Sequence, residues 1–195
     1  MLLIKLSSDY YNLGLTLASM NNLTFAINAL RKASLLDSRN YQSLDALGLC
    51  LYKRGDFAEA KGLWLKSNSI YSGNISLAEK YLSSYEQPSF NKMLDIFNLA
   101  LKDASLGKYN NSIKALTDKN FPCFEYSKFA NLLGLCYISR GEANNARVAF
   151  RKALQIDSEN RLTLNYLKAD WGTLDKAIIN FNVAFFVKKI FIRRS

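Results

Sequence analysis

The side chains that could do chemistry in this sequence are three cysteines and sixteen scattered acids, and no histidine is present. The missing histidine excludes Ser-His-Asp and Cys-His nucleophilic systems and histidine-ligated metal sites. The acidic residues occur singly, and no phosphate-binding loop or Cys-x-x-Cys pair is found. We therefore expect no catalytic residue, no metal site and no cofactor, and we interpret the protein as a non-enzyme.

The cysteines indicate a reducing compartment. Their number is odd, and a chain of 195 residues is long enough to bury a core without disulfide bonds. We expect Cys50 and Cys136 to be small buried hydrophobic residues, and Cys123, which follows Pro122, to be more exposed. The start, Met1 to Lys5, lacks the features of a signal peptide. These observations predict a cytoplasmic protein.

No segment is apolar enough to predict a membrane span. The longest uninterrupted apolar runs, Ala46 to Tyr52 and Leu132 to Ile138, have seven residues each. A transmembrane helix needs about 20 residues.

The net charge of +10 is concentrated at one end, because four basic residues fall within the last eight positions. Elsewhere lysine and arginine occur in pairs, usually with acids nearby, as expected for a solvated surface. The diffuse positive field could also help to recruit acidic partners or anionic lipid. A dense basic stripe is absent, so we expect no specific nucleic-acid binding.

The elements that must position these side chains are helices. Apolar residues recur at spacings of three and four almost throughout, and Pro88 and Pro122 lie between periodic segments. No stretch alternates as a strand would. The segment from Tyr10 to Leu15 aligns with the segment from Leu44 to Leu49 at an offset of 34 residues. The sequence therefore predicts an all-α protein built from repeats.

A second match shows where the repeat is interrupted. Leu47-Gly48-Leu49-Cys50 recurs as Leu133-Gly134-Leu135-Cys136, at an offset of 86 residues, which is two periods plus 18. The additional residues lie near positions 75 to 92.

These patterns resemble the tetratricopeptide repeat. The resemblance is carried by Tyr10, Leu13, Gly14, Leu17, Ala26, Leu30 and Ala33 in the first repeat, by Leu44, Leu47, Gly48, Leu51, Ala60, Trp64 and Ser67 in the second, and by Ala130, Leu133, Gly134, Tyr137, Gly141, Ala146, Phe150 and Ala153 in the fourth. The third is weaker, because Ala100 replaces the first-helix glycine and Ser112 replaces the second-helix alanine. The resemblance implies a right-handed α-solenoid of stacked antiparallel helix pairs, with about four to five repeats and one inserted helix.

The repeat residues have a physical role in helix packing. Two antiparallel helices approach closely only where a backbone carries no bulky side chain, so we expect Gly48 to face Ala60 and Gly134 to face Ala146. Trp64 and Phe150 should fill the wedge towards the following repeat. We expect Gly14 to have the same packing role as Gly48 and Gly134. Two turn glycines, Gly55 and Gly141, should have a positive φ.

The expected organisation has four parts. Residues 1–72 hold repeats one and two, 73–92 form an inserted helix or spacer, 93–184 hold repeats three to five, and 185–195 form a basic aromatic tail. The fifth repeat is degenerate, and its first helix must be short. The inserted segment either splits the solenoid or packs within it. The apolar, cationic C-terminal segment could cap the solenoid, dock a partner or meet a membrane surface.

The resemblance also implies a concave groove lined by the first helices of the repeats. The implied positions are Ser8, Tyr11, Asn12, Leu15, Gln42, Asp45, Ala46, Leu49, Tyr52, Phe97, Asn98, Leu101, Lys128, Asn131, Leu132, Leu135, Ile138, Leu162, Asn165 and Tyr166. Among them, leucine stands at one groove position in four repeats and asparagine stands nearby in four. An asparagine amide can hold a peptide backbone, and leucine adds apolar contact. The alternative is that these leucines are partly covered and that asparagine is merely frequent.

We expect the function of a protein–protein interaction scaffold that binds a partner peptide or helix in this groove. The alternative is a membrane-surface scaffold that uses the C-terminal tail. Chaperone-binding members of the family hold a terminal carboxylate with a clamp of lysine and asparagines, but the equivalent positions here are Tyr11, Leu15 and Ala46. The sequence therefore gives no support for binding of chaperone tails.

Overall fold

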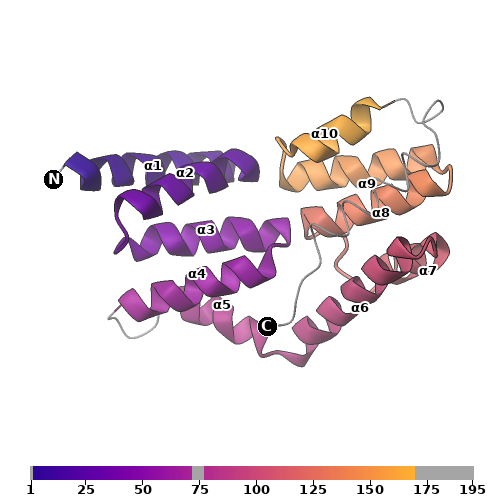
Figure 1. The fold of residues 1–195 in the computed structure, drawn as a ribbon, viewed down its shortest axis with the longest axis horizontal. Coiled ribbons are helices and arrows are strands. Elements are labelled where there is room, and N and C mark those ends of the chain that lie inside the picture. Colours follow the sequence, from indigo (N-terminus) through magenta and orange to yellow (C-terminus); the bar gives the residue numbers. More distant parts are fainter. Residues whose placement is uncertain (1, 72–76, 170–195) are drawn as a thin grey trace. The chain divides into compact units, whose positions relative to one another are not determined.

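The computed structural model describes residues 2–71 and 77–169, and within these ranges the chain is helical and contains no strand (Figure 1). This confirms the predicted all-α class. The helices are α1 (Leu2–Ser19), α2 (Leu23–Leu36), α3 (Tyr41–Arg54), α4 (Phe57–Ile70), α5 (Leu77–Tyr85), α6 (Pro88–Ser105), α7 (Tyr109–Leu116), α8 (Ser127–Ser139), α9 (Ala143–Ile156) and α10 (Arg161–Lys168).

The chain forms two compact units. The N-terminal unit comprises Met1–Phe90 and Asp157–Glu159, and the C-terminal unit comprises Asn91–Ile156 and Asn160–Ser195. Helices α1 to α5 belong to the first of these, whereas most of α6 and helices α7 to α10 belong to the second. The predicted boundaries at 72, 92 and 184 stay predictions. The second helix of the fifth repeat and the tail at 185–195 lie outside the described residues.

The repeat glycines bring helices together by admitting a large side chain. A Cβ atom added to Gly14 would lie 2.5 Å from Cγ of Leu30, and one added to Gly134 would lie 2.5 Å from Cε1 of Phe150. The same atom on Gly48 would lie 2.7 Å from Cε2 of Trp64. We expected the alanine of each pair to face the glycine. The structure shows that the large residue of the same repeat packs directly on the bare backbone.

Helix caps and turn glycines recur at corresponding positions of the repeats. Asn40 caps α3 by accepting a hydrogen bond from the Ser43 backbone N–H at 3.0 Å, and Asn160 caps α10 in the same way at 3.2 Å. The two asparagines end similar segments, Asp37-Ser38-Arg39-Asn40 and Asp157-Ser158-Glu159-Asn160, and in each a side-chain oxygen satisfies an otherwise free N–H. The predicted positive φ is confirmed at Gly55 (94°) and Gly141 (78°).

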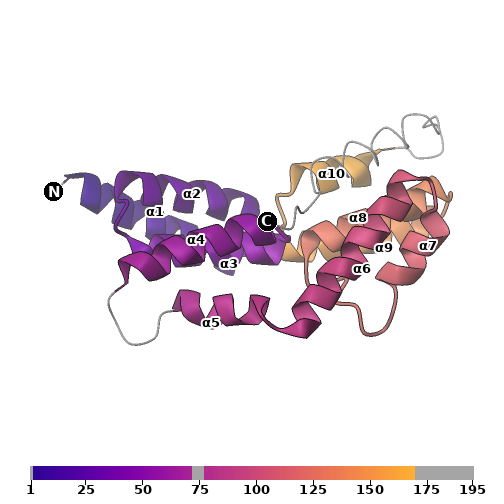
Figure 2. The ribbon, with the colours of Figure 1, turned by 60° about the horizontal axis from the view of Figure 1, so that its bottom comes forward.

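Helix α5 lies beside α4 in the N-terminal unit (Figure 2) and closes an aromatic cluster. The ring of Tyr81 stacks on Trp64 with centroids 4.7 Å apart and planes 11° apart. The Tyr85 hydroxyl donates a hydrogen bond of 2.8 Å to the Phe57 carbonyl oxygen. The inserted segment thus provides the helix that covers Trp64.

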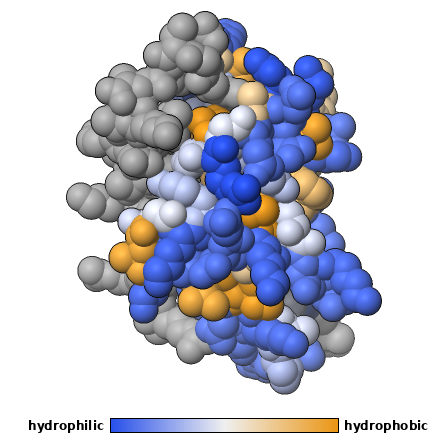
Figure 3. Space-filling view, turned by 90° about the vertical axis from the view of Figure 1, so that its right-hand side faces the viewer, coloured by the Kyte–Doolittle hydropathy of each residue, from blue (hydrophilic) through white to orange (hydrophobic). Residues whose placement is uncertain are grey.

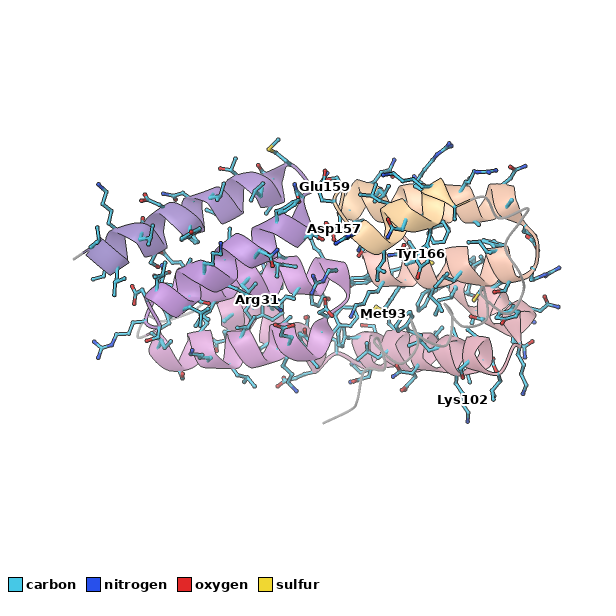
Figure 4. All side chains as sticks on the ribbon, turned by 45° about the horizontal axis from the view of Figure 1, so that its top comes forward. Arg31, Met93, Lys102, Asp157, Glu159 and Tyr166 are labelled. Atoms are coloured by element: carbon cyan, nitrogen blue, oxygen red, sulfur yellow. The ribbon has the colours of Figure 1, made fainter. Side chains whose placement is uncertain are left out.

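In the C-terminal unit, a tyrosine stacks in a similar way on the large aromatic residue of α9. Tyr166 of α10, labelled in Figure 4, stacks on Phe150 of α9 with centroids 5.2 Å apart. Phe97 of α6 and Phe129 of α8 stack at 4.0 Å. Helix α10 has eight residues, which confirms the expected short first helix of the fifth repeat.

Candidate functional site

A pocket of about 370 Å³ opens on the N-terminal unit. Its lining comes from α1, from α3, from the end of α4 and from the start of α5. The lining residues are Tyr11, Leu15, Tyr41, Gln42, Asp45, Ala46, Leu49, Tyr71 and Leu77.

Helical spacing brings these residues to one surface. In α3, Tyr41, Asp45 and Leu49 follow one another at intervals of four, so they share a helix face, and Gln42 and Ala46 adjoin them. In α1, Tyr11 and Leu15 have the same spacing. Tyr71 ends α4 in an extended conformation, and its ring lies 4.9 Å from that of Tyr41. Tyrosines therefore reach the pocket from α1, from α3 and from the residue that follows α4.

Six of the groove positions implied by the family resemblance line this pocket: Tyr11, Leu15, Gln42, Asp45, Ala46 and Leu49. Sequence reasoning missed Tyr41, Tyr71 and Leu77. The fourfold spacing from Tyr41 to Asp45 could have revealed the first of these. Tyr71 and Leu77 stand at the end of α4 and the start of α5, and the repeat pattern does not predict how the chain connects these two helices.

Three further residues of the predicted groove in this unit lie elsewhere. Ser8 and Asn12 are exposed on α1 but do not line the pocket. Tyr52 is half-buried in the aromatic cluster, where its ring meets that of Phe57 edge to face at 5.2 Å.

The predicted groove residues of the C-terminal unit are largely inaccessible. Leu101, Leu135 and Asn131 are only 0%, 1% and 2% exposed, which contradicts their expected availability to a partner. Asn131 instead accepts a hydrogen bond of 2.9 Å from the Thr163 hydroxyl. Asn98 is half-buried, and Asn165 is exposed on α10.

Asp45 is the charged residue of the pocket, and it is 5% exposed. Its backbone carbonyl oxygen accepts a hydrogen bond of 3.2 Å from the Trp64 indole N–H, but its Oδ1 atom has no hydrogen-bond partner within the part of the chain that the structure describes. Burial raises the pKa of the carboxyl group, and a hydrogen bond from the Ser67 side chain offsets part of that rise. The Ser67 hydroxyl also lies 3.3 Å from the Tyr41 carbonyl oxygen, so its single proton serves two acceptors.

The cysteines are not reactive thiols. Cys50 and Cys136 are buried as expected, and burial raises the pKa of each to about 11. The expectation of a more exposed Cys123 is wrong, since it is only 4% exposed and burial raises its pKa to about 12. Such thiols stay protonated near neutral pH, where the thiolate is needed for attack.

Within residues 2–71 and 77–169, no three potential ligands from cysteine, aspartate and glutamate come together to hold a metal ion. No described helix has the length and apolar character of a membrane span. On the face drawn in Figure 3, hydrophobic residues form small patches between hydrophilic ones. Salt bridges such as Arg31–Glu59 (2.6 Å) are exposed and contribute little to stability.

Comparison with known proteins identifies the repeat. The family model described as tetratricopeptide repeat matches residues 10–40 and 127–160. These ranges cover α1 with α2 and α8 with α9, one helix pair in each compact unit. No curated protein sequence matches the chain.

Among solved structures, the chain is similar to YrrB, described as a TPR protein with an unusual peptide-binding site. The sequence identity is 21%, the match covers 82% of this chain and 91% of YrrB, and the TM-score is 0.37. The family match and the helix pairs described above show tetratricopeptide repeats at residues 10–40 and 127–160 of the chain.

Proposed function

We propose that the protein is a non-catalytic interaction scaffold that binds a peptide or helix of a partner protein on the N-terminal unit. The observation that carries this proposal is the pocket lined by α1, α3 and α5. Its volume of about 370 Å³ lies within the range of roughly 300–1,000 Å³ that is usual for ligand pockets.

The composition of the pocket suits a peptide. Leucine and tyrosine side chains supply most of the lining, and Gln42 and Asp45 supply polar groups. Large aromatic side chains that combine apolar surface with a polar tip are enriched where proteins bind partners. A peptide that lies across α1 and α3 would bury Leu15, which is 40% exposed in the free protein.

The other residues of the predicted groove enter this proposal only where they are exposed. Asn12 and Asn165 are exposed and could extend the contact surface, each within its own unit. Leu101, Asn131 and Leu135 are left out of the proposed contact surface because they are buried. We propose no catalytic role, cofactor or metal for any of these residues.

The substitution Leu15→Lys tests the pocket. A library of random peptides displayed on phage is selected against the wild-type protein, and the affinities of the enriched peptides are then measured. Leu15→Lys puts a long charged side chain into the apolar lining, so peptide binding should weaken by roughly tenfold or more. The matched control is Leu35→Lys on α2, a residue that is 83% exposed and does not line the pocket.

The control variant should bind the peptides as the wild type does, and circular dichroism should show that both variants keep the helical fold. The proposal is wrong if no peptide is enriched, or if Leu15→Lys and Leu35→Lys bind the enriched peptides equally well.

A further inference from the structure

The pocket of the N-terminal unit contains a carboxylate without a matching cation. Among the nine residues that line it, Asp45 is the one charged side chain. That residue is 95% buried, since its exposed fraction is 5%, and its Oδ1 atom has no hydrogen-bond partner among the described residues. A buried polar atom without a partner loses its hydration and gains nothing in return.

The fold does not require an acid at this position. Two contacts tie this part of α3 to α4: the backbone carbonyl oxygen of Asp45 accepts from the Trp64 indole N–H, and the Ser67 side chain donates to the carboxyl group. Any residue could supply the carbonyl group, and an asparagine amide oxygen could accept from Ser67 in place of the carboxylate. The Oδ1 atom of Asp45 still lacks a positive charge or a hydrogen-bond donor among the described residues, and Asp45 lines a pocket.

The walls of the pocket also favour a cation. Tyr11, Tyr41 and Tyr71 line it together with Asp45. The faces of aromatic rings carry partial negative charge and attract a cation placed over them. No lysine or arginine lines the pocket, so no positive charge in the lining opposes a cationic ligand or attracts a carboxylate.

Resting on the proposed function, we propose that this pocket recognises a basic side chain of the partner peptide, with arginine as the preferred residue. A guanidinium group is planar and weakly hydrated, it stacks on aromatic rings, and its N–H groups pair with carboxylate oxygens. The carboxyl group of Asp45 accepts from the guanidinium, and the neighbouring tyrosines flank it. Lysine offers the same charge but stacks less well and holds its hydration more strongly.

The net charge of +10 does not prevent this recognition. At physiological ionic strength the screening length is about 8 Å, so distant surface charges act only weakly on a ligand in the pocket. The pairing with Asp45 is short-range. The positive surface should slow the approach of a basic peptide more than it weakens the bound state.

The test uses three defined probes and the full-length protein. The probes are the capped tripeptides acetyl-Gly-Arg-Gly-amide, acetyl-Gly-Lys-Gly-amide and acetyl-Gly-citrulline-Gly-amide, titrated into labelled protein while NMR shifts are recorded. Citrulline has nearly the shape of arginine but no charge. We expect the arginine peptide to shift the signals of Asp45 and of the pocket tyrosines, and the citrulline peptide to bind roughly tenfold or more weakly.

Two variants test whether the preference for the arginine peptide depends on the pocket. Asp45→Asn should reduce the affinity for the arginine peptide to that for the citrulline peptide. Asp9→Asn removes the same charge from an exposed position on α1 and should leave the affinity unchanged. The comparison of arginine with citrulline needs no variant, so the inference remains testable even if Asp45→Asn folds poorly.

The inference fails if the arginine and citrulline peptides bind equally, if neither binds, or if a folded Asp45→Asn protein still prefers arginine. Failure of the proposed function is a separate result. If phage selection yields peptides that bind through the pocket without a basic residue, the interaction function stands and the arginine preference is wrong.

Discussion

At the residue scale, Asp45 combines two roles that can be separated. Its backbone holds Trp64 in place through a hydrogen bond of 3.2 Å, while its side chain places a poorly satisfied carboxyl group in the pocket. Stability alone would favour an apolar or amide side chain here. Functional sites commonly hold groups that cost stability, because those groups are satisfied only when a ligand binds.

This reasoning predicts that Asp45→Asn stabilises the free protein at pH 7. The pKa of Asp45 is raised by burial, so the folded state binds a proton more readily than the unfolded state does. The stability of the wild type therefore falls as the pH rises through the ordinary carboxyl range and up to the raised pKa. Asparagine does not titrate. The gain in unfolding free energy should be about 1 kcal/mol or less at pH 7 and should shrink on acidification.

Thermal melting of both proteins at pH 7 and at pH 4 measures this difference. Asp9→Asn, a change at an exposed residue, should stay within about 0.5 kcal/mol of the wild type at pH 7. A melting temperature of Asp45→Asn below that of the wild type at pH 7 would contradict the prediction.

At the element scale, the helix pairs depend on glycines that accept a large side chain. Gly134→Ala would place a Cβ atom 2.5 Å from the Phe150 ring, and that ring is fully buried and stacked on Tyr166. The ring cannot move away freely. We expect Gly134→Ala to lower the unfolding free energy by about 1–3 kcal/mol, since overpacking outweighs the better helix propensity of alanine.

Gly62 provides the matched control. It lies within α4, and an added Cβ atom would meet nothing within 4 Å. Gly62→Ala should therefore raise the unfolding free energy by roughly 0.5–1 kcal/mol, because alanine loses less backbone entropy on folding. Urea denaturation of both variants measures the two changes. Equal effects of the same sign would show that propensity, and not packing, decides at Gly134.

The inserted segment shows how far an element can be predicted. The apolar spacing within 73–92 correctly indicated a helix, but the structure places two helices there, with α5 ending at Tyr85 and α6 beginning at Pro88. Proline is well suited to the first turn of a helix, because its missing N–H would have no partner there. The role of α5 in covering Trp64 depends on ring contacts that no helical period reveals.

At the scale of the whole molecule, a repeat protein is stabilised by local contacts between neighbouring helices. Ala146 is 0% exposed, so Ala146→Arg adds bulk and an unpaired charge to the interior of the C-terminal unit. We expect a loss of more than about 3 kcal/mol of unfolding free energy. Hydrogen exchange should accelerate mainly in α8, α9 and α10, and much less in α3 and α4.

Val148→Arg is the control for this prediction, because Val148 lies on the same helix and is 52% exposed. It should change exchange rates little. Hydrogen exchange followed by mass spectrometry of peptic fragments gives the rates helix by helix. If Ala146→Arg accelerated exchange equally in both compact units, the assumption of local stabilisation would be wrong.

The sequence by itself determined the helical class, the 34-residue repeat and the turn glycines, and its family resemblance implied six residues that line the pocket. The helices and turns follow from local rules, because helical period, capping and positive φ depend on residues close together in the chain. Tertiary structure alone decided which predicted groove residues are accessible. Leu101 and Leu135 occupy the same repeat position as Leu15 and Leu49, yet they are buried.

Tertiary structure also decided the chemistry of the pocket. Tyr71 joins Tyr41 and Asp45 in the pocket only because α3 and the end of α4 are held together, and burial then gives the carboxyl group of Asp45 its raised pKa. Burial and unmet hydrogen bonds depend on all the contacts that distant parts of the chain make with a residue. A repeat pattern in the sequence does not show which residues those contacts bury.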